Sequence, residues 1–286
     1  MTLITAVVTL GVLAAILVTL LAIANRVLFV ATDARLEAVI QELPGTNCGA
    51  CGYAGCSTFA AALSNGDAVP AQCTVSSADT KVSLAAFLGV DVGKTTERIA
   101  RLACAGGTNV ARVHAHYRGE RTCAAAAPVA GAGHGCAWGC LGFGDCDRAC
   151  SFDAIIMNSH ALPEIDPDLC VACNDCVVAC PRDLFELVPR DQRLWVTCSN
   201  PLAGDELLAD CQVACTACAK CAFDAPGTVS MQENLPAVDA AAAQTRDAIE
   251  RCPTGAIVWL DDGGRFIMGR DARPPVRLGP LPVAPS

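Results

Sequence analysis

Cysteine is the residue that most restricts how this chain can fold: it accounts for 20 of the 286 residues and recurs mostly in short, regularly spaced groups. Groups of this kind are typical of small domains held together by disulfides or by metal. Only 8 Phe, 3 Trp and 2 Tyr are available to fill a core. We therefore expect several small domains rather than one broad hydrophobic core.

Charge and motif content exclude several classes of function. The formal net charge is −9 and the isoelectric point is near 4.9, whereas a nucleic-acid-binding protein needs a concentrated basic face. The sequence has no GxGxxG dinucleotide fingerprint, no GxxxxGK[ST] phosphate loop and no nucleophile–base set. We therefore expect no catalytic residues for bond-making chemistry in this chain.

The N-terminal segment predicts a membrane anchor. Residues 3–24 carry no charge and are long enough to cross a hydrocarbon core of about 30 Å as a helix. A cleaved signal peptide is the alternative, since Ala22-Ile23-Ala24 resembles a cleavage site. However, no Lys or Arg precedes the run, and the apolar part of a signal peptide is usually only about 7–15 residues. These two features favour an uncleaved transmembrane helix.

The charged residues beside this span predict its orientation. Arg26 and Arg35 follow it closely, and basic flanks favour the cytoplasmic side of a membrane. The chain should then be a single-pass protein of the inner (cytoplasmic) membrane, with its cysteine-rich part in the cytoplasm. Because that compartment is reducing and disfavours structural disulfides, metal is the favoured partner of the cysteines.

The first cysteine group predicts an iron–sulfur site. Its spacing is Cys48-x2-Cys51-x4-Cys56-x16-Cys73, with glycines between the first three thiols. Glycine permits the positive φ and the close backbone approach that a compact inorganic centre requires. The fourth thiol returns after a helix predicted over 57–63. Four thiolates would also suit zinc, but the grouping of three plus one favours a [4Fe-4S] cluster.

The second group matches the bacterial ferredoxin motif. Its spacing is Cys170-x2-Cys173-x2-Cys176-x3-Cys180 followed by proline, and in such motifs the fourth cysteine ligates the other cluster of a pair. An irregular copy precedes it, with the spacing Cys136-x3-Cys140-x5-Cys146-x3-Cys150. Exchange of the fourth ligands predicts two [4Fe-4S] clusters. Their ligands are Cys136, Cys140, Cys146 and Cys180 for one, and Cys150, Cys170, Cys173 and Cys176 for the other.

The third group is an incomplete ferredoxin pair. The run Cys215-x2-Cys218-x2-Cys221 has Ala225 where the fourth cysteine is expected, and the downstream half keeps only Cys252. Under the exchange rule, the surviving thiols are one complete set and the lost ones all belong to the second set. We therefore predict one working [4Fe-4S] cluster in this module, for a total of four clusters. Its ligands are Cys215, Cys218, Cys221 and Cys252.

Four cysteines remain outside these sets, namely Cys104, Cys123, Cys198 and Cys211. The simpler interpretation is that they are buried or free thiols that pack as small hydrophobic residues. The alternative is that Cys198 or Cys211 replaces a neighbouring ligand, or that some of the four hold a further metal.

These patterns predict an α+β chain of several units. Helices are expected over 33–43, 57–63 and 80–88, and short strands over 154–157, 184–188 and 256–260. The expected order is a transmembrane anchor at 1–30, a helical four-cysteine [4Fe-4S] domain at 31–76, a connector at 77–135, a two-cluster ferredoxin-like domain at 136–190, a degenerate single-cluster ferredoxin-like domain at 207–262 and a disordered tail at 270–286.

The combination of motifs resembles a known family. The N-terminal span, the Cys48–Cys73 domain and the phrases CAGG (104–107), GCLGFGDC (139–146) and CSN (198–200) are together similar to the B subunit of the Rnf ion-translocating electron-transport complex, called Rsx in some bacteria. The similarity covers nearly the whole chain and is to the longer form, which has a second ferredoxin module. The resemblance implies an electron-transfer subunit of a multi-subunit, ion-translocating oxidoreductase. It also implies that soluble ferredoxin and the other membrane and peripheral subunits of an Rnf-type complex are the partners.

Two other interpretations stay open from the sequence. A polyferredoxin subunit of another membrane oxidoreductase, such as a hydrogenase or a quinone-linked reductase, would share the ferredoxin modules but would not need the Cys48–Cys73 domain. A membrane-tethered iron–sulfur sensor or a zinc-stabilised scaffold is the third interpretation, although a sensor should also carry an output domain.

Overall fold

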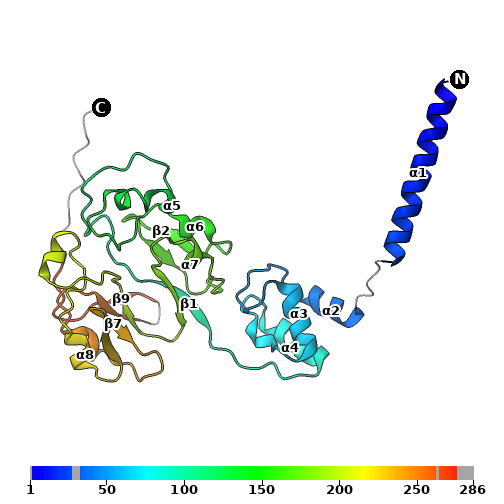
Figure 1. Cartoon of the computed structure of the whole chain (residues 1–286). Helices are drawn as coiled ribbons and strands as arrows, with labels where there is room; N and C mark the ends of the chain where they lie inside the picture. The colour runs from blue at the N-terminus through cyan, green and yellow to red at the C-terminus, as the bar shows by residue number, and fades with distance from the viewer. Residues whose placement is uncertain (1, 28–32, 262–263, 276–286) are drawn as a thin grey trace.

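In the computed structural model, an isolated N-terminal helix precedes the cysteine-rich part of the chain (Figure 1). The structure describes residues 2–27, 33–261 and 264–275. Helix α1 (Thr2–Val27) is followed by residues outside this description. Its stretch Ile4–Arg26 has a mean hydropathy of 2.8 and is long enough to cross a membrane, and none of its most apolar window is buried against the rest of the chain. This placement agrees with the predicted anchor.

A small helical domain follows α1, built from α2 (Ala34–Glu42), α3 (Cys56–Asn65) and α4 (Ala78–Leu88). Side-chain caps start two of these helices, because Asp33 accepts from the backbone of Arg35 and Ser77 accepts from the backbone of Thr80. The three helices share one buried core, and all three coincide with helices predicted from the sequence. The core side chains include Val39, Phe59, Leu63, Leu84 and Leu88.

Helix α4 lies in the segment 77–135 that was expected to be a connector. Its buried Leu84 and Leu88 pack in the core of the helical domain, so that domain continues beyond residue 76. The same segment also supplies β1 (Arg98–Leu102), which pairs antiparallel with β4 (Phe185–Pro189). The segment therefore joins the helical domain to the ferredoxin-like part by contributing elements to both.

The first ferredoxin-like module contains two short helices and two two-stranded sheets. Helices α6 and α7 pack side by side, β2 pairs antiparallel with β3, and β4 pairs with β1. Strands β2 and β4 coincide with predicted strands. The bounds not yet given are α6 (Asp145–Ala149), α7 (Asp175–Ala179), β2 (Ile155–Met157) and β3 (Pro163–Ile165).

The second module repeats this plan and is tied to the first by a strand between them. Strand β5 (Leu194–Val196) lies between the two modules in sequence, and it pairs antiparallel with β8 (Ile257–Leu260). The indole N–H of Trp195 donates to the carbonyl of Leu102 over 2.8 Å, which ties β5 to β1. The other elements of the module are α8 (Lys220–Asp224), β6 (Val229–Gln232), β7 (Leu235–Val238), α9 (Asp247–Glu250) and β9 (Phe266–Ile267).

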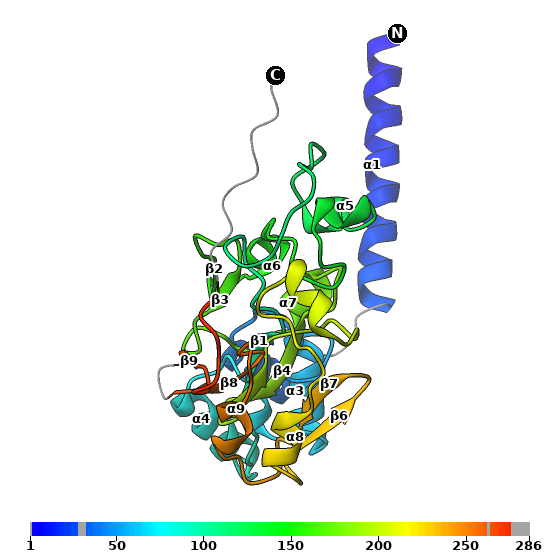
Figure 2. The ribbon, with the colours of Figure 1, turned by 90° about the vertical axis from the view of Figure 1, so that its left-hand side faces the viewer.

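A buried apolar cluster joins the two modules. Ile99 of β1, Val188 of β4, Trp195 of β5 and Val258 and Leu260 of β8 pack together. Figure 2 shows β1, β4 and β8 close together in the ferredoxin-like part. The two ferredoxin-like modules therefore form one packed unit.

The segments that remain are short helices and the C-terminal end. Asp271 and Arg273 donate backbone hydrogen bonds to the carbonyls of Glu250 and Pro253, so the chain stays attached to the second module beyond residue 262. The rest of the predicted tail, 276–286, lies outside the described residues. The short helices are η1 (Pro70–Gln72), α5 (Cys123–Ala126), η2 (Ala130–Gly133) and η3 (Asp205–Ala209).

Candidate iron–sulfur sites

The first cysteine set lies in the helical domain and packs with its core. Cys73 is buried in its core, and Cys51 and Cys56 pack against that core. Burial raises the pKa of the Cys51 thiol, and the nearby thiols of Cys73 and Cys48 add to the increase. The loop that carries these thiols turns at Gly49 and Gly52, both at positive φ. The structure thus places Cys48 and Cys73 near Cys51, and it packs Cys56 against the same core.

The chain around this set holds the sulfurs in place. The carboxamide oxygen of Asn47 accepts from the backbone N–H of Cys56 over 2.8 Å, and the Ser76 hydroxyl donates to the Sγ of Cys73 over 3.1 Å. A Cβ at Gly55 would lie only 2.9 Å from the Asn47 oxygen. Glycine at this position is therefore needed for the loop to close around the thiols.

The ferredoxin-like modules share one loop geometry, which fixes the register of their motifs. Each of α6, α7 and α8 is preceded by a residue in the left-handed region, at Gly144, Asn174 and Ala219. A second positive-φ residue lies two positions earlier in each loop, at Gly142, Ala172 and Ala217. In the two regular motifs the second cysteine, Cys173 or Cys218, lies between these two positions. The corresponding residue in the irregular motif is Phe143.

Two of the predicted cluster sites appear as cavities lined by their four cysteines. Cys150, Cys170, Cys173 and Cys176 line one cavity together with Phe152, Ile155 and Leu187. Cys215, Cys218, Cys221 and Cys252 line another together with Met231 and Ile257. Apolar side chains contribute to the lining of both cavities, while Cys218 at the edge of the second one is exposed.

In the second module, apolar side chains occupy the place where a second cluster would be bound by the missing cysteines. Ala225 and Ala248, at two of the vanished ligand positions, are both buried in the apolar core of this module. Beside that core an ion pair links the end of α8 to the residue after α9, with the Arg251 guanidinium donating to the Asp224 carboxylate over 2.5 and 2.7 Å. Packing thus occupies the region where a second cluster would lie in a complete ferredoxin.

The remaining predicted set differs from the structure at one ligand. Cys140, Cys146 and Cys180 line a common cavity as predicted, but the fourth cysteine in its lining is Cys123. Cys136 instead lines a neighbouring cavity together with the three other unassigned cysteines and with Cys140. The cysteines of this second cavity are Cys104, Cys136, Cys140, Cys198 and Cys211.

The sequence contained one signal for this difference. Counting back from Cys146 and Cys150 with regular ferredoxin spacing places Cys140 at the first ligand position and Phe143 at the second. Assigning Cys136 and Cys140 as the first two ligands moves Cys140 from the first ligand position to the second. Cys123 has no spacing signal, because it reaches the site from a separate helix, α5.

The donor chemistry of these sites fits iron–sulfur clusters. Thiolates are the ligands that hold [4Fe-4S] clusters. Among residues 2–27, 33–261 and 264–275, no three His, Cys, Asp or Glu side chains are close enough to bind one metal ion. A zinc ion would need its four sulfurs at about 2.3 Å from one point, whereas a cluster holds them farther apart at its corners. Four thiols that line one cavity without converging on a single point therefore favour a cluster over a single ion.

Burial makes these thiols poor acids without a metal centre. It raises the pKa of Cys146, Cys176 and Cys215 to about 12 each, and neighbouring thiols contribute to the increase. A bound metal centre supplies the positive charge that holds such groups as thiolates.

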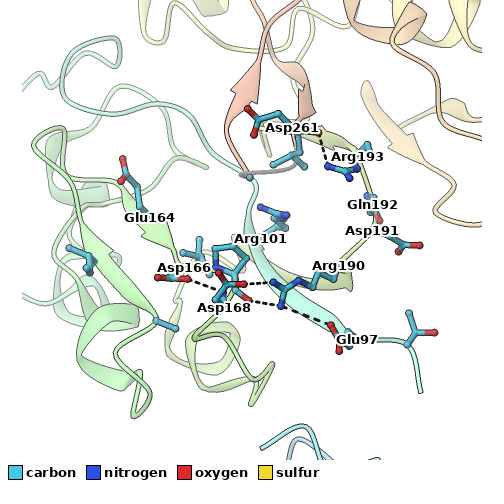
Figure 3. Close-up of a pocket in the computed structure, with 17 residues that line it drawn as sticks. Glu97, Arg101, Glu164, Asp166, Asp168, Arg190, Asp191, Gln192, Arg193 and Asp261 are labelled. Carbon is cyan, nitrogen blue, oxygen red and sulfur yellow. Dashed lines mark hydrogen bonds and ion pairs between the residues drawn. The ribbon is translucent and has the colours of Figure 1, made fainter. Parts of the chain in front are cut away.

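A separate, charged groove of about 870 Å³ lies beside the first module, and its described lining contains no cysteine (Figure 3). Arg190 spans part of it, donating to the carboxylate of Asp168 and to the carbonyl of Pro167. Arg101 is 8% exposed, and its Nε has no hydrogen-bond partner in the described part of the chain. Burial lowers the pKa of Arg101, while the nearby Cys170 raises it. The groove thus brings a buried positive charge close to the Cys150–Cys176 site.

Comparison with known proteins agrees with these sites. A family model described as "Putative Fe-S cluster" matches residues 43–75, and one described as "4Fe-4S binding domain" matches residues 162–185. The first match covers the Cys48–Cys73 set, and the second covers Cys170 to Cys180. Both matches therefore fall in regions where the structure gathers thiols.

Whole-chain relatives point to one family. The chain is 35% identical over 83% of its length to the B subunit of the Na(+)-translocating ferredoxin:NAD(+) oxidoreductase complex of Acetobacterium woodii, and covers 72% of that protein. It is 30% identical to the B subunit of the ion-translocating oxidoreductase complex of Methanosarcina acetivorans, with 83% of this chain and 91% of the relative covered. It is 32% identical to the B subunit of the proton-translocating ferredoxin:NAD(+) oxidoreductase complex of Clostridium ljungdahlii, with 85% and 87% covered.

These likenesses extend over most of the chain, and α1 is compatible with association with a membrane. The chain belongs to the family of B subunits of the Rnf-type ion-translocating oxidoreductase complexes, as an iron–sulfur subunit of that enzyme.

Proposed function

We propose that this subunit relays electrons between soluble ferredoxin and the other subunits of an Rnf-type ferredoxin:NAD oxidoreductase that is coupled to ion transport. The names of two relatives include ferredoxin and NAD(+) as reactants of their complexes. This chain supplies sets of four cysteines around cavities that could hold [4Fe-4S] clusters. When bound, the clusters carry the redox change, while the protein sets their separation, exposure and potential.

The observation that carries this proposal is the contact between the helical domain and the first ferredoxin-like module. The hydroxyl of Thr74, next to Cys73, donates to the carbonyl of Val171 over 2.7 Å. Val171 lies between Cys170 and Cys173, so this bond brings two thiol sets from different domains next to each other. Neighbouring sets of this kind are what a path for electrons requires.

The relay continues within the ferredoxin-like module. Helices α6 and α7 pack side by side, and they carry Cys146 and Cys176 of different sets. The thiol of Cys146, which belongs to the other set, is among the groups that raise the pKa of Cys176, and this places the two sets within electrostatic reach of each other. Three sets therefore lie in series from the helical domain into the first module.

Membrane attachment completes the proposal. Helix α1 would anchor the subunit in a single pass, with Arg26 at its C-terminal end on the cytoplasmic side. The cluster-bearing domains would then be exposed to soluble ferredoxin. A cysteine-reactive reagent or a protease applied to right-side-out and to inverted vesicles tests this orientation. The proposal expects labelling by the reagent, or cleavage of the large domain by the protease, in inverted vesicles alone.

The deciding experiment is reduction of the anaerobically purified complex by reduced ferredoxin, followed by rapid freezing and EPR. The proposal expects clusters of this subunit to be reduced before NAD(+) is consumed, in an assembly that contains flavin and oxidises NADH. Co-purification with a nickel or molybdenum enzyme instead would support a polyferredoxin subunit of another oxidoreductase. Stoichiometric zinc without labile sulfide would overturn the relay.

A further inference from the structure

The irregular ferredoxin motif lacks a thiol at its second ligand position, and a distant cysteine lies where that thiol is needed. Phe143 occupies the position equivalent to Cys173 and Cys218, between the two positive-φ residues of its loop. Cys123 is 8% exposed and lines the same cavity as Cys140, Cys146 and Cys180. It also contributes to the raised pKa of Cys146. Cys123 is therefore placed to be the fourth ligand.

A network of backbone hydrogen bonds fixes Cys123 in this position. The N–H groups of Cys123 and Ala124, at the start of α5, donate to the carboxylate of Asp145 over 2.8 and 2.9 Å. Asp145 is the first residue of α6, which carries Cys146. The carboxylate thus holds the first turn of α5 against the first turn of α6, and it brings Cys123 and Cys146 to the same cavity.

Cys136, which does not line the ferredoxin-like site, lies beside the three cysteines that belong to no motif. Cys104, Cys136, Cys198 and Cys211 all line one cavity, together with Gly106, Asn200 and Ala214. Burial raises the pKa of Cys211 to about 12, and the thiols of Cys104, Cys136 and Cys198 add to that shift. These four side chains come from four separate segments of the chain, so local sequence proximity does not account for their gathering.

The sulfurs of this set accept backbone hydrogen bonds, as ligated thiolates do. The N–H groups of Gly106 and Cys140 each donate to the Sγ of Cys104 over 3.4 Å. The N–H of Cys215 donates to the Sγ of Cys198 over 3.3 Å. A Cβ at Gly106 would lie 3.3 Å from the Sγ of Cys211 and 3.5 Å from that of Cys104, so a glycine leaves room between two of the thiols.

We propose that the chain holds a fifth [4Fe-4S] cluster, ligated by Cys104, Cys136, Cys198 and Cys211, and that Cys123 completes the first ferredoxin-like site. Cys140 borders both cavities. Assigning it to the ferredoxin-like site leaves four cysteines around each. All 20 cysteines of the sequence then fall into five sets of four, and no thiol is left over.

The location of the fifth set gives it a role, and that role depends on the proposed relay function. Through the N–H of Cys140 the set adjoins the first module, and through the N–H of Cys215 it adjoins the cluster site of the second module. It therefore lies between the two ferredoxin-like modules. A cluster here would connect the three sets described above to the Cys215–Cys252 set.

Iron and sulfide analysis of the purified full-length protein tests the number of clusters without any substitution. Five clusters correspond to about twenty iron and twenty sulfide per chain, against about sixteen of each for four clusters. Mössbauer spectra should assign all of this iron to [4Fe-4S] centres. A content of about sixteen iron, or stoichiometric zinc in addition to it, would overturn the proposal.

Substitutions identify the ligands. Cys211→Ser and Cys104→Ser should each remove about four iron and one EPR centre, and the centre lost should be the same in both variants. Cys252→Ser is the matched control, since it should remove a different centre. Retention of full iron by both Cys211→Ser and Cys104→Ser would overturn the fifth site.

The role of Cys123 has a rescue test that does not depend on loss alone. Cys123→Ser should remove or destabilise the centre at the first ferredoxin-like site, and Cys123→Ser combined with Phe143→Cys should restore it by supplying a thiol at the regular second position. If Cys123→Ser keeps this centre while Cys136→Ser loses it, Cys136 is the ligand and the reassignment fails.

The two proposals can fail separately. If iron content and spectroscopy show five centres but reduced ferredoxin does not reduce them, the fifth site is supported and the relay is rejected. Four centres that ferredoxin reduces rapidly would support the relay and reject the fifth site.

Discussion

The backbone N–H of Cys140 donates to the Sγ of Cys104 over 3.4 Å, so the main chain of one thiol set contacts a sulfur of its neighbour. The side chain of Cys140 lines the first ferredoxin-like cavity, whereas Cys104 lines the next one. Hydrogen bonds to sulfur are one of the means by which a protein adjusts cluster potential. The conformation of this loop therefore bears on two sites at once.

The close approach at Gly106 predicts a local effect of adding one methyl group. We expect Gly106→Ala to lower the iron content by up to about four per chain, because its Cβ would lie 3.3 Å from the Sγ of Cys211. Iron analysis and EPR of the purified protein measure the loss. Gly11→Ala is the control, since a Cβ there meets nothing within 4 Å. Equal iron in both variants would contradict the prediction.

The incomplete second module predicts an asymmetric response to two substitutions. Cys252→Ser should remove one EPR centre and leave the others, because Cys252 is the one ligand that its set takes from the downstream half. Ala225→Cys should restore no centre, because its partner positions are also without thiols and its site is filled by the apolar core. A new centre in the Ala225→Cys protein would show that the vanished site is still able to bind iron.

The buried Arg101 predicts a change in potential at the Cys150–Cys176 site. Arg101→Gln removes a positive charge near Cys170, and a positive charge favours the reduced cluster. We therefore expect the midpoint potential to fall, by less than the roughly 59 mV that corresponds to a tenfold change in a one-electron equilibrium. EPR-monitored redox titration measures it. Arg101→Lys keeps the charge, so a fall of the same size in that variant would argue against an electrostatic cause.

The packing of α4 predicts that residues beyond 76 stabilise the first iron–sulfur domain. Leu84 is 1% exposed in its core, and we expect Leu84→Ala to destabilise the domain by about 2–5 kcal/mol. The measurement is the midpoint temperature at which the cluster absorbance is lost. Val82, on the same helix, is 58% exposed, so Val82→Ala should leave that temperature nearly unchanged.

The loop before α5 carries exposed arginines that could dock a ferredoxin with an acidic surface. Docking there predicts that the rate of reduction by ferredoxin depends on salt. Arg118 and Arg121 are exposed there, whereas Arg101 is buried and cannot contribute to a docking surface. Reversing both exposed residues to Glu should slow reduction by acidic ferredoxin at low salt and have less effect at high salt, where charges are screened. Stopped-flow reduction at two ionic strengths makes the comparison. An unchanged rate at low salt would exclude this loop as the docking site.

Spacing within a motif was enough to predict the cysteines that line two of the cavities, as well as the main helices. The sets around Cys170 and Cys215 follow from local repeats, because each loop and the helix after it recur in a fixed geometry. The ligand Cys123 could not be found in this way, since it is 17 residues before Cys140 and reaches the site only through α5 and Asp145. The strand β1 was missed for a similar reason: its partner β4 follows 83 residues later, counted from Leu102 to Phe185.

The apolar cluster of Ile99, Val188, Trp195, Val258 and Leu260 means that the two ferredoxin-like modules cannot be excised from each other. A gene truncated after β4 would remove Trp195 and leave Ile99 and Val188 uncovered, and it would also delete Cys198 and Cys211. Because the two modules share one apolar cluster, each depends on the other for part of its core. We therefore expect truncation after β4 to destabilise the first module by exposing Ile99 and Val188.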